Sequence, residues 1–417
     1  MENKVYSAQA PSELRTWSKD LGDIQVILQL NKKEMTSSAS KWTSRHLVAY
    51  RLLTRPQAPF LPILEVIHQK QCPICSQEPS PQVLDHTSLA VIIGETPPNL
   101  CKKTEGELMR LPGGFFWAAL ARATRPELVD QARTHPQRER RQVQREGYIN
   151  SGNAIPGSSS PIQRSSSEFE ADMDLDEDVH EERRTKPEEV TVHLVTSFLQ
   201  YALSLCLLQQ TSGKTEVRPR IERKKTTAYI SNNIPVTAED DGGICLMRQT
   251  GLGWKVNHPY LALLEAKRAF KYIHVEERTG SYIPSVSNEH LAQYLGEAVI
   301  TWKGNQEYLG KDVFLIAATN VFVRIIHFEF GHGYMEYLDA LDEKTQINIA
   351  NDDENDAFVY MHSTRWLNLQ TQDERRIALC HILALLRWHD AEGIRDDTED
   401  SELGDNSDYG DSMDIKE

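Results

Sequence analysis

The sequence predicts an α/β protein of the mixed α+β kind, and three observations support this class. The first is a run of five apolar residues, Tyr260 to Leu264, which is typical of a strand buried on both faces of a sheet. The second is that short apolar segments alternate with amphipathic helical segments between residues 188 and 390. The third is the length of 417 residues, which allows two or three domains with a substantial core.

The predicted elements of this region follow one another in the order helix, a group of strands, helix, strand region. The first helix is expected because apolar residues recur at helical spacing from Val190 to Leu205. A last helix, apolar over most of its circumference, should follow the final strand. In chain order we expect a helix over 190–210, strands at 217–221, 226–230, 244–247 and 260–267, a helix over 288–302, a long strand region over 313–330, and a buried helix over 372–389.

Charged side chains follow the buried strand directly. Residues two apart in a strand point the same way, so Glu265 and Lys267 should lie side by side on one face of the sheet. Bare charges at the end of a buried strand are costly unless they are paired or bind a ligand. An acidic step at Asp240 and Asp241 enters a neighbouring apolar run. Together these groups predict a site for a hard cation with a lysine beside it, which suits metal-assisted hydrolysis.

An aspartate followed after a spacer by Glu-x-Lys at the end of an apolar strand resembles the PD-(D/E)XK nuclease superfamily, in particular its fungal RecB-like branch. The resemblance covers residues 187–390. It implies a restriction-endonuclease-like core, in which a central mixed sheet is flanked by helices. The Pro-Asp dipeptide of the superfamily is absent, and Gly242 and Gly243 separate Asp241 from the following strand. Either Asp240 or Asp241 can be the motif aspartate, and Asp241 is preferred because it is nearer to the strand.

The resemblance also implies roles for individual residues. Asp241 and Glu265, with Asp240 as the alternative ligand, would hold Mg²⁺ or Mn²⁺, helped by the backbone carbonyl of Ala266. Lys267 would orient the attacking water or stabilise charge on the phosphate. Gln293 on the following helix would face the site and contact the substrate, or it is a solvent-facing residue. Independently of the resemblance, Arg268 just past the motif would suit a phosphate contact, or it belongs to a solvated face. The competing interpretation makes Glu265 and Lys267 an exposed ion pair at a strand end.

Charge is distributed unevenly along the chain. The segments 168–182 and 390–417 carry −9 and −10 of the total formal charge of −15, which leaves +4 for the remainder. We therefore predict a disordered linker at 126–187, basic and then acidic, and a disordered acidic tail at 391–417. The domain organisation that follows is an N-terminal region of unknown fold at 1–125 and a nuclease-like domain at 188–390. The basic cluster at 138–145 is either a nuclear-import signal or the polar face of a helix.

The cysteines and the N-terminus bear on location and on zinc. Six dispersed cysteines and a start without a secretory signal predict an intracellular protein, cytoplasmic or nuclear. No uninterrupted apolar stretch approaches membrane-spanning length, so no membrane association is expected. Cys72 and Cys75 have the spacing of half a zinc site, but no second half follows in the sequence, so structural zinc there is disfavoured and two ordinary thiols are expected.

The leading functional hypothesis is metal-dependent phosphodiester hydrolysis of DNA or RNA, with nucleic acid as the partner. The second is a catalytically degenerate module of the same fold that binds nucleic acid or protein. The third is an interaction scaffold with acidic tails. Metal binding separates the first hypothesis from the other two, and salt-sensitive binding of nucleic acid separates the second from the third.

Overall fold

The computed structural model describes most of the chain outside its acidic segments. The linker predicted at 126–187 and the tail predicted at 391–417 lie outside the described residues, apart from their edges at Pro187 and Ala391. The described ranges are 4–72, 74–75, 93–125, 187–204, 214–231, 233–267, 273–276, 281–284, 286–352 and 354–391.

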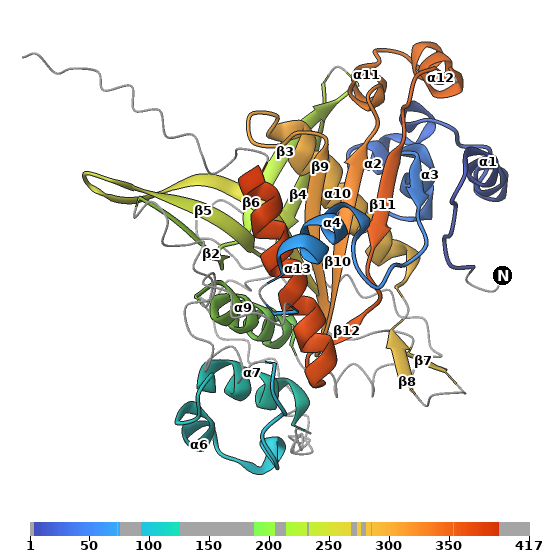
Figure 1. The fold of residues 1–417 in the computed structure, drawn as a ribbon. Coiled ribbons are helices and arrows are strands. Elements are labelled where there is room, and N and C mark those ends of the chain that lie inside the picture. Colours follow the sequence, from blue (N-terminus) through green and yellow to red (C-terminus); the bar gives the residue numbers. More distant parts are fainter. Residues whose placement is uncertain are drawn as a thin grey trace, which may run out of the picture. The chain divides into compact units, whose positions relative to one another are not determined.

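A mixed sheet of eight strands forms the centre of the described structure, with helices on its faces (Figure 1). This confirms the predicted α/β class. Two neighbouring pairs, β6 with β9 and β1 with β11, are parallel, and the other pairs are antiparallel. The strands in sheet order are β1 (Leu52–Thr54), β11 (Val359–Ser363), β10 (Phe322–Phe330), β9 (Asp312–Thr319), β6 (Gly253–Lys267), β5 (Gly243–Thr250) and β2 (Thr215–Arg220), with β12 (Leu367–Asn368) beside β10.

Two further hairpins and a set of helices complete the described structure. The hairpins are β3 (Lys224–Ile230) with β4 (Ile234–Asp240), and β7 (Ile273–Glu276) with β8 (Ser281–Pro284). The helices are α1 (Pro11–Asp20), α2 (Lys32–Met35), α3 (Ser44–Ala49), α4 (Pro62–Gln71), α6 (Glu105–Met109), α7 (Gly114–Thr124), α9 (Glu188–Ser204), α10 (Asn288–Gly304), α11 (Tyr334–Asp339), α12 (Glu343–Asn351) and α13 (Gln372–Ala391).

Strand β6 lies between two hydrophobic cores. Its residues alternate between them: Leu263 belongs to the core that contains α10 and the N-terminal helices, whereas Leu264 and Ala266 belong to the core that contains α4, α7, α9 and α13. Tyr260 to Ala266 are all buried, as expected for a strand covered on both faces. Glu265 follows the same alternation as Leu263, so its carboxyl group points towards α10.

The long strand region predicted at 313–330 is two strands rather than one. Strands β9 and β10 form an antiparallel hairpin in which Thr319 pairs with Phe322. The chain turns at Asn320, whose φ of 50° lies in the left-handed region that asparagine tolerates better than most residues. Apolar residues flank this turn on both sides, so hydrophobicity alone does not mark it.

The N-terminal region is part of the same structural unit as the predicted nuclease-like domain. The described parts of residues 1–124 and 187–391 cluster together, and β1 pairs in parallel with β11 at the edge of the sheet. Tyrosine hydroxyls join the two parts, since Tyr334 donates to the carbonyl of Tyr50 at 2.9 Å and Tyr337 donates to that of Ala49 at 2.5 Å. Residue 188 is therefore not a boundary between independent cores.

This arrangement predicts that residues 187–391 alone will not fold cooperatively. The isolated fragment exposes the apolar residues that otherwise pack on the N-terminal helices, and it loses the strand beside β11. Urea unfolding followed by tryptophan fluorescence should show a broad or absent transition for the fragment, and co-expression with residues 1–124 should restore a sharp one. A cooperative transition in the isolated fragment would show that the N-terminal region is dispensable.

Candidate active site

Two glycines bring Asp241 against the end of β6. Gly242 and Gly243 have φ values of +136° and +155°, and a Cβ atom on them would lie 2.5 Å and 2.1 Å from backbone oxygens of Arg220 and Ala262. This close approach lets the Asp241 N–H donate to the Leu264 carbonyl at 2.9 Å. The Ala266 N–H in turn donates to Asp241 Oδ2 at 3.0 Å. The glycine pair that departs from the superfamily motif thus positions the aspartate.

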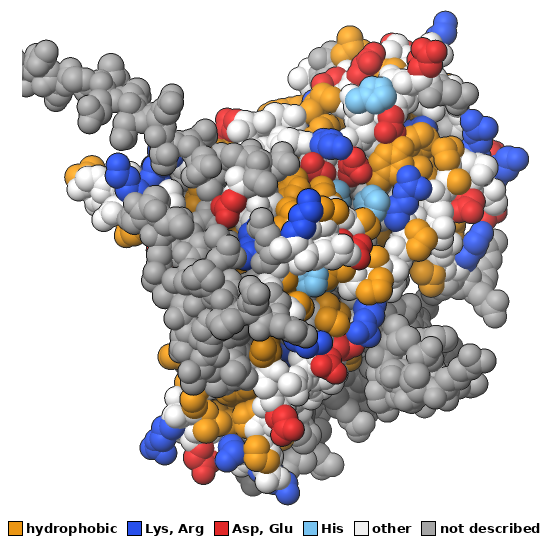
Figure 2. Space-filling view, viewed as in Figure 1, with side chains coloured by type: hydrophobic (Ala, Val, Ile, Leu, Met, Phe, Trp, Pro, Cys, Tyr) orange, Lys and Arg blue, Asp and Glu red, His pale blue; other side chains and the backbone are white. Residues whose placement is uncertain are grey.

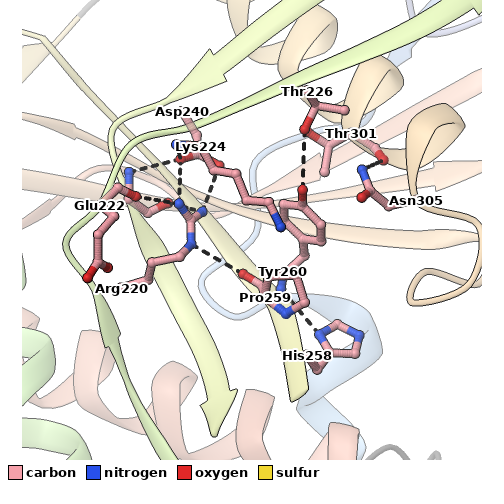
Figure 3. A network of polar contacts seen from close by, with 11 residues as sticks. Arg220, Glu222, Lys224, Thr226, Asp240, His258, Pro259, Tyr260, Thr301 and Asn305 are labelled. Carbon is pink, nitrogen blue, oxygen red and sulfur yellow. Dashed lines mark hydrogen bonds and ion pairs between the residues drawn. The ribbon is translucent and has the colours of Figure 1, made fainter. Parts of the chain in front are cut away.

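Asp240 points to a different set of partners (Figure 3). Its two oxygens accept hydrogen bonds from Arg220 at 2.9 Å and 2.6 Å, and one of them also accepts from the Lys224 N–H at 3.0 Å. Burial raises the pKa of Asp240, and the Arg220 guanidinium opposes that rise. The structure therefore commits Asp240 to a buried ion pair that joins β4 to β2, and it leaves Asp241 as the aspartate beside Glu265.

Glu265 and Lys267 form a buried ion pair on one face of β6. The side chain of Glu265 is almost fully buried and that of Lys267 is 17% exposed, so the alternative of an exposed pair at a strand end does not hold. Burial raises the pKa of Glu265 to about 7, a rise that Lys267 opposes and Asp241 increases. Burial also acts against the charge of Lys267, but the Glu265 carboxylate outweighs it and the pKa of Lys267 is raised.

Helix α10 adds an amide and a second carboxyl group to the site. Gln293 donates to Glu265 Oε1 and, at 2.9 Å, to Glu297 Oε1. Gln293 therefore faces the site, where it holds Glu265 in place. Glu297 is fully buried, and no hydrogen-bond partner is found for its Oε2 within the described part of the chain. Burial and the neighbouring Glu265 raise the pKa of Glu297 well above its usual range.

Two further residues at the site escaped the sequence analysis. Glu188, at the start of α9, is 25% exposed and interacts electrostatically with Lys267 and Asp241. Arg223 is 51% exposed and reaches Asp241 Oδ1 at 3.0 Å and Glu188 Oε1 at 3.6 Å. The Glu188-Glu189 pair in the first turn of α9 was the available signal, but the helix was expected to begin at Val190. These partly exposed side chains form the solvent side of the site.

The structure thus gathers Asp241, Glu265, Lys267 and Gln293 in one place, as the sequence analysis expected, while Asp240 lies apart in its pair with Arg220. Arg268, the other expected substrate contact, lies outside the described residues. Its role in substrate binding stays a prediction.

A second cluster of metal-binding side chains lies elsewhere in the fold. His68, Cys72, Cys75 and Cys380 come together with their ligand atoms within 4.8 Å of one another, and such a set could bind a metal such as zinc. The sequence analysis disfavoured zinc because no second half of the site followed Cys75. The structure supplies the missing thiol from α13, more than three hundred residues along the chain.

Comparison with known proteins gives no relative from which a role could be carried over: no family model and no curated protein matches the chain. Within the described ranges, no helix has both the length and the apolar character needed to cross a membrane. On the face seen in Figure 2, basic and acidic side chains are intermingled rather than sorted by sign. Any argument about function therefore depends on the geometry of the site.

The raised pKa of Glu265 predicts how stability depends on pH in protein without added Mg²⁺ or Mn²⁺. The pKa rises from 4.5 to about 7 on folding, so the folded state binds more protons than the unfolded state in this window. Raising the pH through it therefore favours unfolding. The free energy of unfolding of wild type and Glu265→Gln can be measured in urea at about pH 5, 6 and 7.5. As the pH rises, the variant should become more stable relative to wild type, by about 3 kcal/mol at most. If the free energies of unfolding of the two proteins change with pH in parallel, the pKa of Glu265 is not raised.

Proposed function

We propose that the chain hydrolyses phosphodiester bonds of DNA or RNA with the help of a divalent cation, Mg²⁺ or Mn²⁺, held by Asp241 and Glu265. The observation that carries the proposal is the charge balance of the site. Within the described ranges, four carboxyl groups, those of Glu188, Asp241, Glu265 and Glu297, interact with two cationic groups, Lys267 and Arg223; Arg268 lies outside these ranges.

This balance supports a divalent cation rather than a purely structural ion-pair network. With every group ionised, the set carries two more negative charges than positive ones. Unpaired charge in a buried site is costly, and the carboxyl groups respond by retaining protons, as the raised pKa values of Glu265 and Glu297 indicate. One divalent cation supplies the two missing positive charges. Carboxylate oxygens are also the ligands that Mg²⁺ prefers.

The residues present fit such a cation. Asp241 and Glu265 come from two different segments yet lie together at the end of β6, and the fully buried carboxyl group of Glu297 lies against that of Glu265. A cation bound there would lower the pKa of a water molecule and polarise the phosphate. Gln293 keeps Glu265 oriented, since it donates to both glutamates of the site.

Lys267 provides a positive charge that can act on the substrate phosphate. Its raised pKa keeps the ammonium group charged, and its side chain reaches the solvent side of the site. A fixed positive charge there can stabilise the negative charge that develops on a phosphate during hydrolysis. Arg223, half exposed beside Asp241, is placed to contact a phosphate of the substrate.

The second candidate is a module of this fold that binds nucleic acid without cutting it. The observation in its favour is the depth of Glu265, whose carboxyl group is nearly inaccessible and already engaged by Lys267 and Gln293. If those contacts satisfy Glu265 permanently, no cation is needed. Measured affinity for Mn²⁺ distinguishes the two candidates.

Removing either proposed ligand should abolish cation binding. Titration calorimetry of the full-length protein with Mn²⁺ at about pH 8, above the raised pKa of Glu265, should show binding that disappears in Asp241→Asn and Glu265→Gln. The matched control is Glu329→Gln. Glu329 lies on β10 and forms a surface ion pair with Lys311, so this variant removes one negative charge away from the site and should leave Mn²⁺ binding unchanged. Folded wild type that binds no Mn²⁺ at millimolar concentration would leave the binding module as the better description.

Substituting Lys267 should separate cleavage from cation binding. Lys267→Ala is expected to bind Mn²⁺ at about pH 8, because lysine is not a ligand, but to lose most of its cleavage rate, since a charge that acts in the transition state is gone. The substrates are single-stranded DNA, duplex DNA and RNA. Lys311→Ala, which removes an exposed lysine from the Glu329 pair, is the control. Wild-type cleavage by Lys267→Ala on every substrate that wild type cuts would refute this mechanism.

A further inference from the structure

Four metal-binding side chains meet where α4 and α13 pack together. They are thiols and an imidazole, whereas the ligands of the candidate active site are carboxylates. His68 and Cys72 lie one turn apart at the end of α4, where the Cys72 N–H donates to the His68 carbonyl at 3.0 Å. Cys75 follows three residues later, and Cys380 comes from the middle of α13. Cys72 and Cys380 are buried, whereas Cys75 is exposed.

Three of the six distances among the ligand atoms match those of a tetrahedral site, and all six are within 4.8 Å. Cys380 Sγ lies 3.7 Å from both Cys72 Sγ and Cys75 Sγ, and Cys75 Sγ lies 3.5 Å from His68 Nε2. In a tetrahedron with zinc–sulfur bonds of about 2.3 Å and zinc–nitrogen bonds of about 2.05 Å, neighbouring sulfurs are about 3.8 Å apart and sulfur and nitrogen about 3.5 Å. The sulfurs are also much too far apart for a disulfide, whose bond is about 2.05 Å.

We propose that His68, Cys72, Cys75 and Cys380 bind one zinc ion, which fastens the end of α4 to α13. This inference does not depend on the proposed function, because it rests on a different set of residues and a different ligand chemistry.

The ligand set selects zinc and a structural role. Three thiolates and one imidazole are soft ligands that favour zinc over Mg²⁺, which prefers oxygen. Four protein ligands close the coordination sphere and leave no position for a substrate, as in structural zinc sites. Neighbouring aromatic residues hold the imidazole ligand in place. The ring of Phe60 stacks on that of His68, with 4.3 Å between the ring centroids, and on that of His381, with 3.7 Å between the ring centroids.

The position of the ion explains what it would stabilise. Cys75 and Cys380 are 305 residues apart, so a shared ion links the N-terminal region to the last helix. Helix α13 is itself anchored to the central strand, where His389 Nε2 bonds to the Leu261 carbonyl of β6 at 2.9 Å. Zinc would thus secure the helix that covers the same strand whose end carries Glu265.

The decisive experiment compares two exposed thiols of one protein. Full-length protein without an affinity tag, purified without chelator, should contain one zinc per chain by elemental mass spectrometry. Cys75 and Cys101 are both exposed, so both are accessible to iodoacetamide without a metal, and the rates measured in chelated protein give the reference for each thiol. We expect a strong chelator to raise the rate of Cys75 at least tenfold and to leave that of Cys101 little changed.

Variants then assign the ion to this site. Cys75→Ser should lose the zinc, whereas Cys101→Ser, the matched control, should retain it. His68→Ala should weaken zinc binding and His68→Cys should keep it, because a fourth thiolate preserves the tetrahedral set. Chelation should lower the Tm of wild type and of Cys101→Ser but leave that of Cys75→Ser unchanged.

Three results would overturn the proposal. They are the absence of zinc from folded wild type, rapid alkylation of Cys75 in protein that contains zinc, and a disulfide between any two of the three cysteines. Because Cys75 is exposed, its substitution by serine does not disturb the hydrophobic core. Retention of zinc by folded Cys75→Ser would therefore also count against the site.

Discussion

The burial of the Glu265 carboxyl group is the constraint on which the site depends. Strand β6 lies between two hydrophobic cores, so Glu265, which follows its alternation, is almost fully shielded from solvent. A carboxyl group in that position needs partners within the protein. Lys267 on the same face of the strand and Gln293 on the facing helix provide them. Gln293 on α10 therefore has two roles. It satisfies the buried carboxyl group of Glu265, and it fixes the orientation of that group in the site.

Local patterns predicted several of the elements around this strand but missed β4. Apolar runs and helical spacing located β2, β3, β5 and β6 as well as α10 and α13, and residue alternation placed Glu265 and Lys267 on one face. The same patterns did not find the turn at Asn320, because both flanking strands are equally apolar. They also suggested an independent C-terminal domain, since nothing local indicates that Leu52–Thr54 pairs with a strand three hundred residues later.

The residues missed at both candidate sites share a physical reason. Glu188 reaches Asp241 and Lys267 only because α9 packs on the sheet, and Cys380 reaches Cys72 only because α13 packs on α4. Each contact is created by tertiary packing between segments far apart in the sequence. A spacing rule such as Cys-x-x-Cys detects ligands on one turn and is blind to a partner on another helix. Conversely, Asp240 and Asp241 are indistinguishable in the sequence, and the buried guanidinium of Arg220 separates their roles.

The electrostatics of the site also imply an order of events for the proposed reaction. Without a cation and above the raised pKa of Glu265, the ionised carboxylates of Glu188, Asp241 and Glu265 outnumber the two cations, Lys267 and Arg223, that contact them. A phosphate approaching the site then meets net negative charge and is repelled. A divalent cation reverses this, because it neutralises the excess and leaves Lys267 and Arg223 on the solvent side to attract the phosphate. If the chain is a nuclease, cation binding must therefore precede productive binding of the nucleic acid, and the affinity for substrate should depend on Mn²⁺ even in a variant that cannot cut.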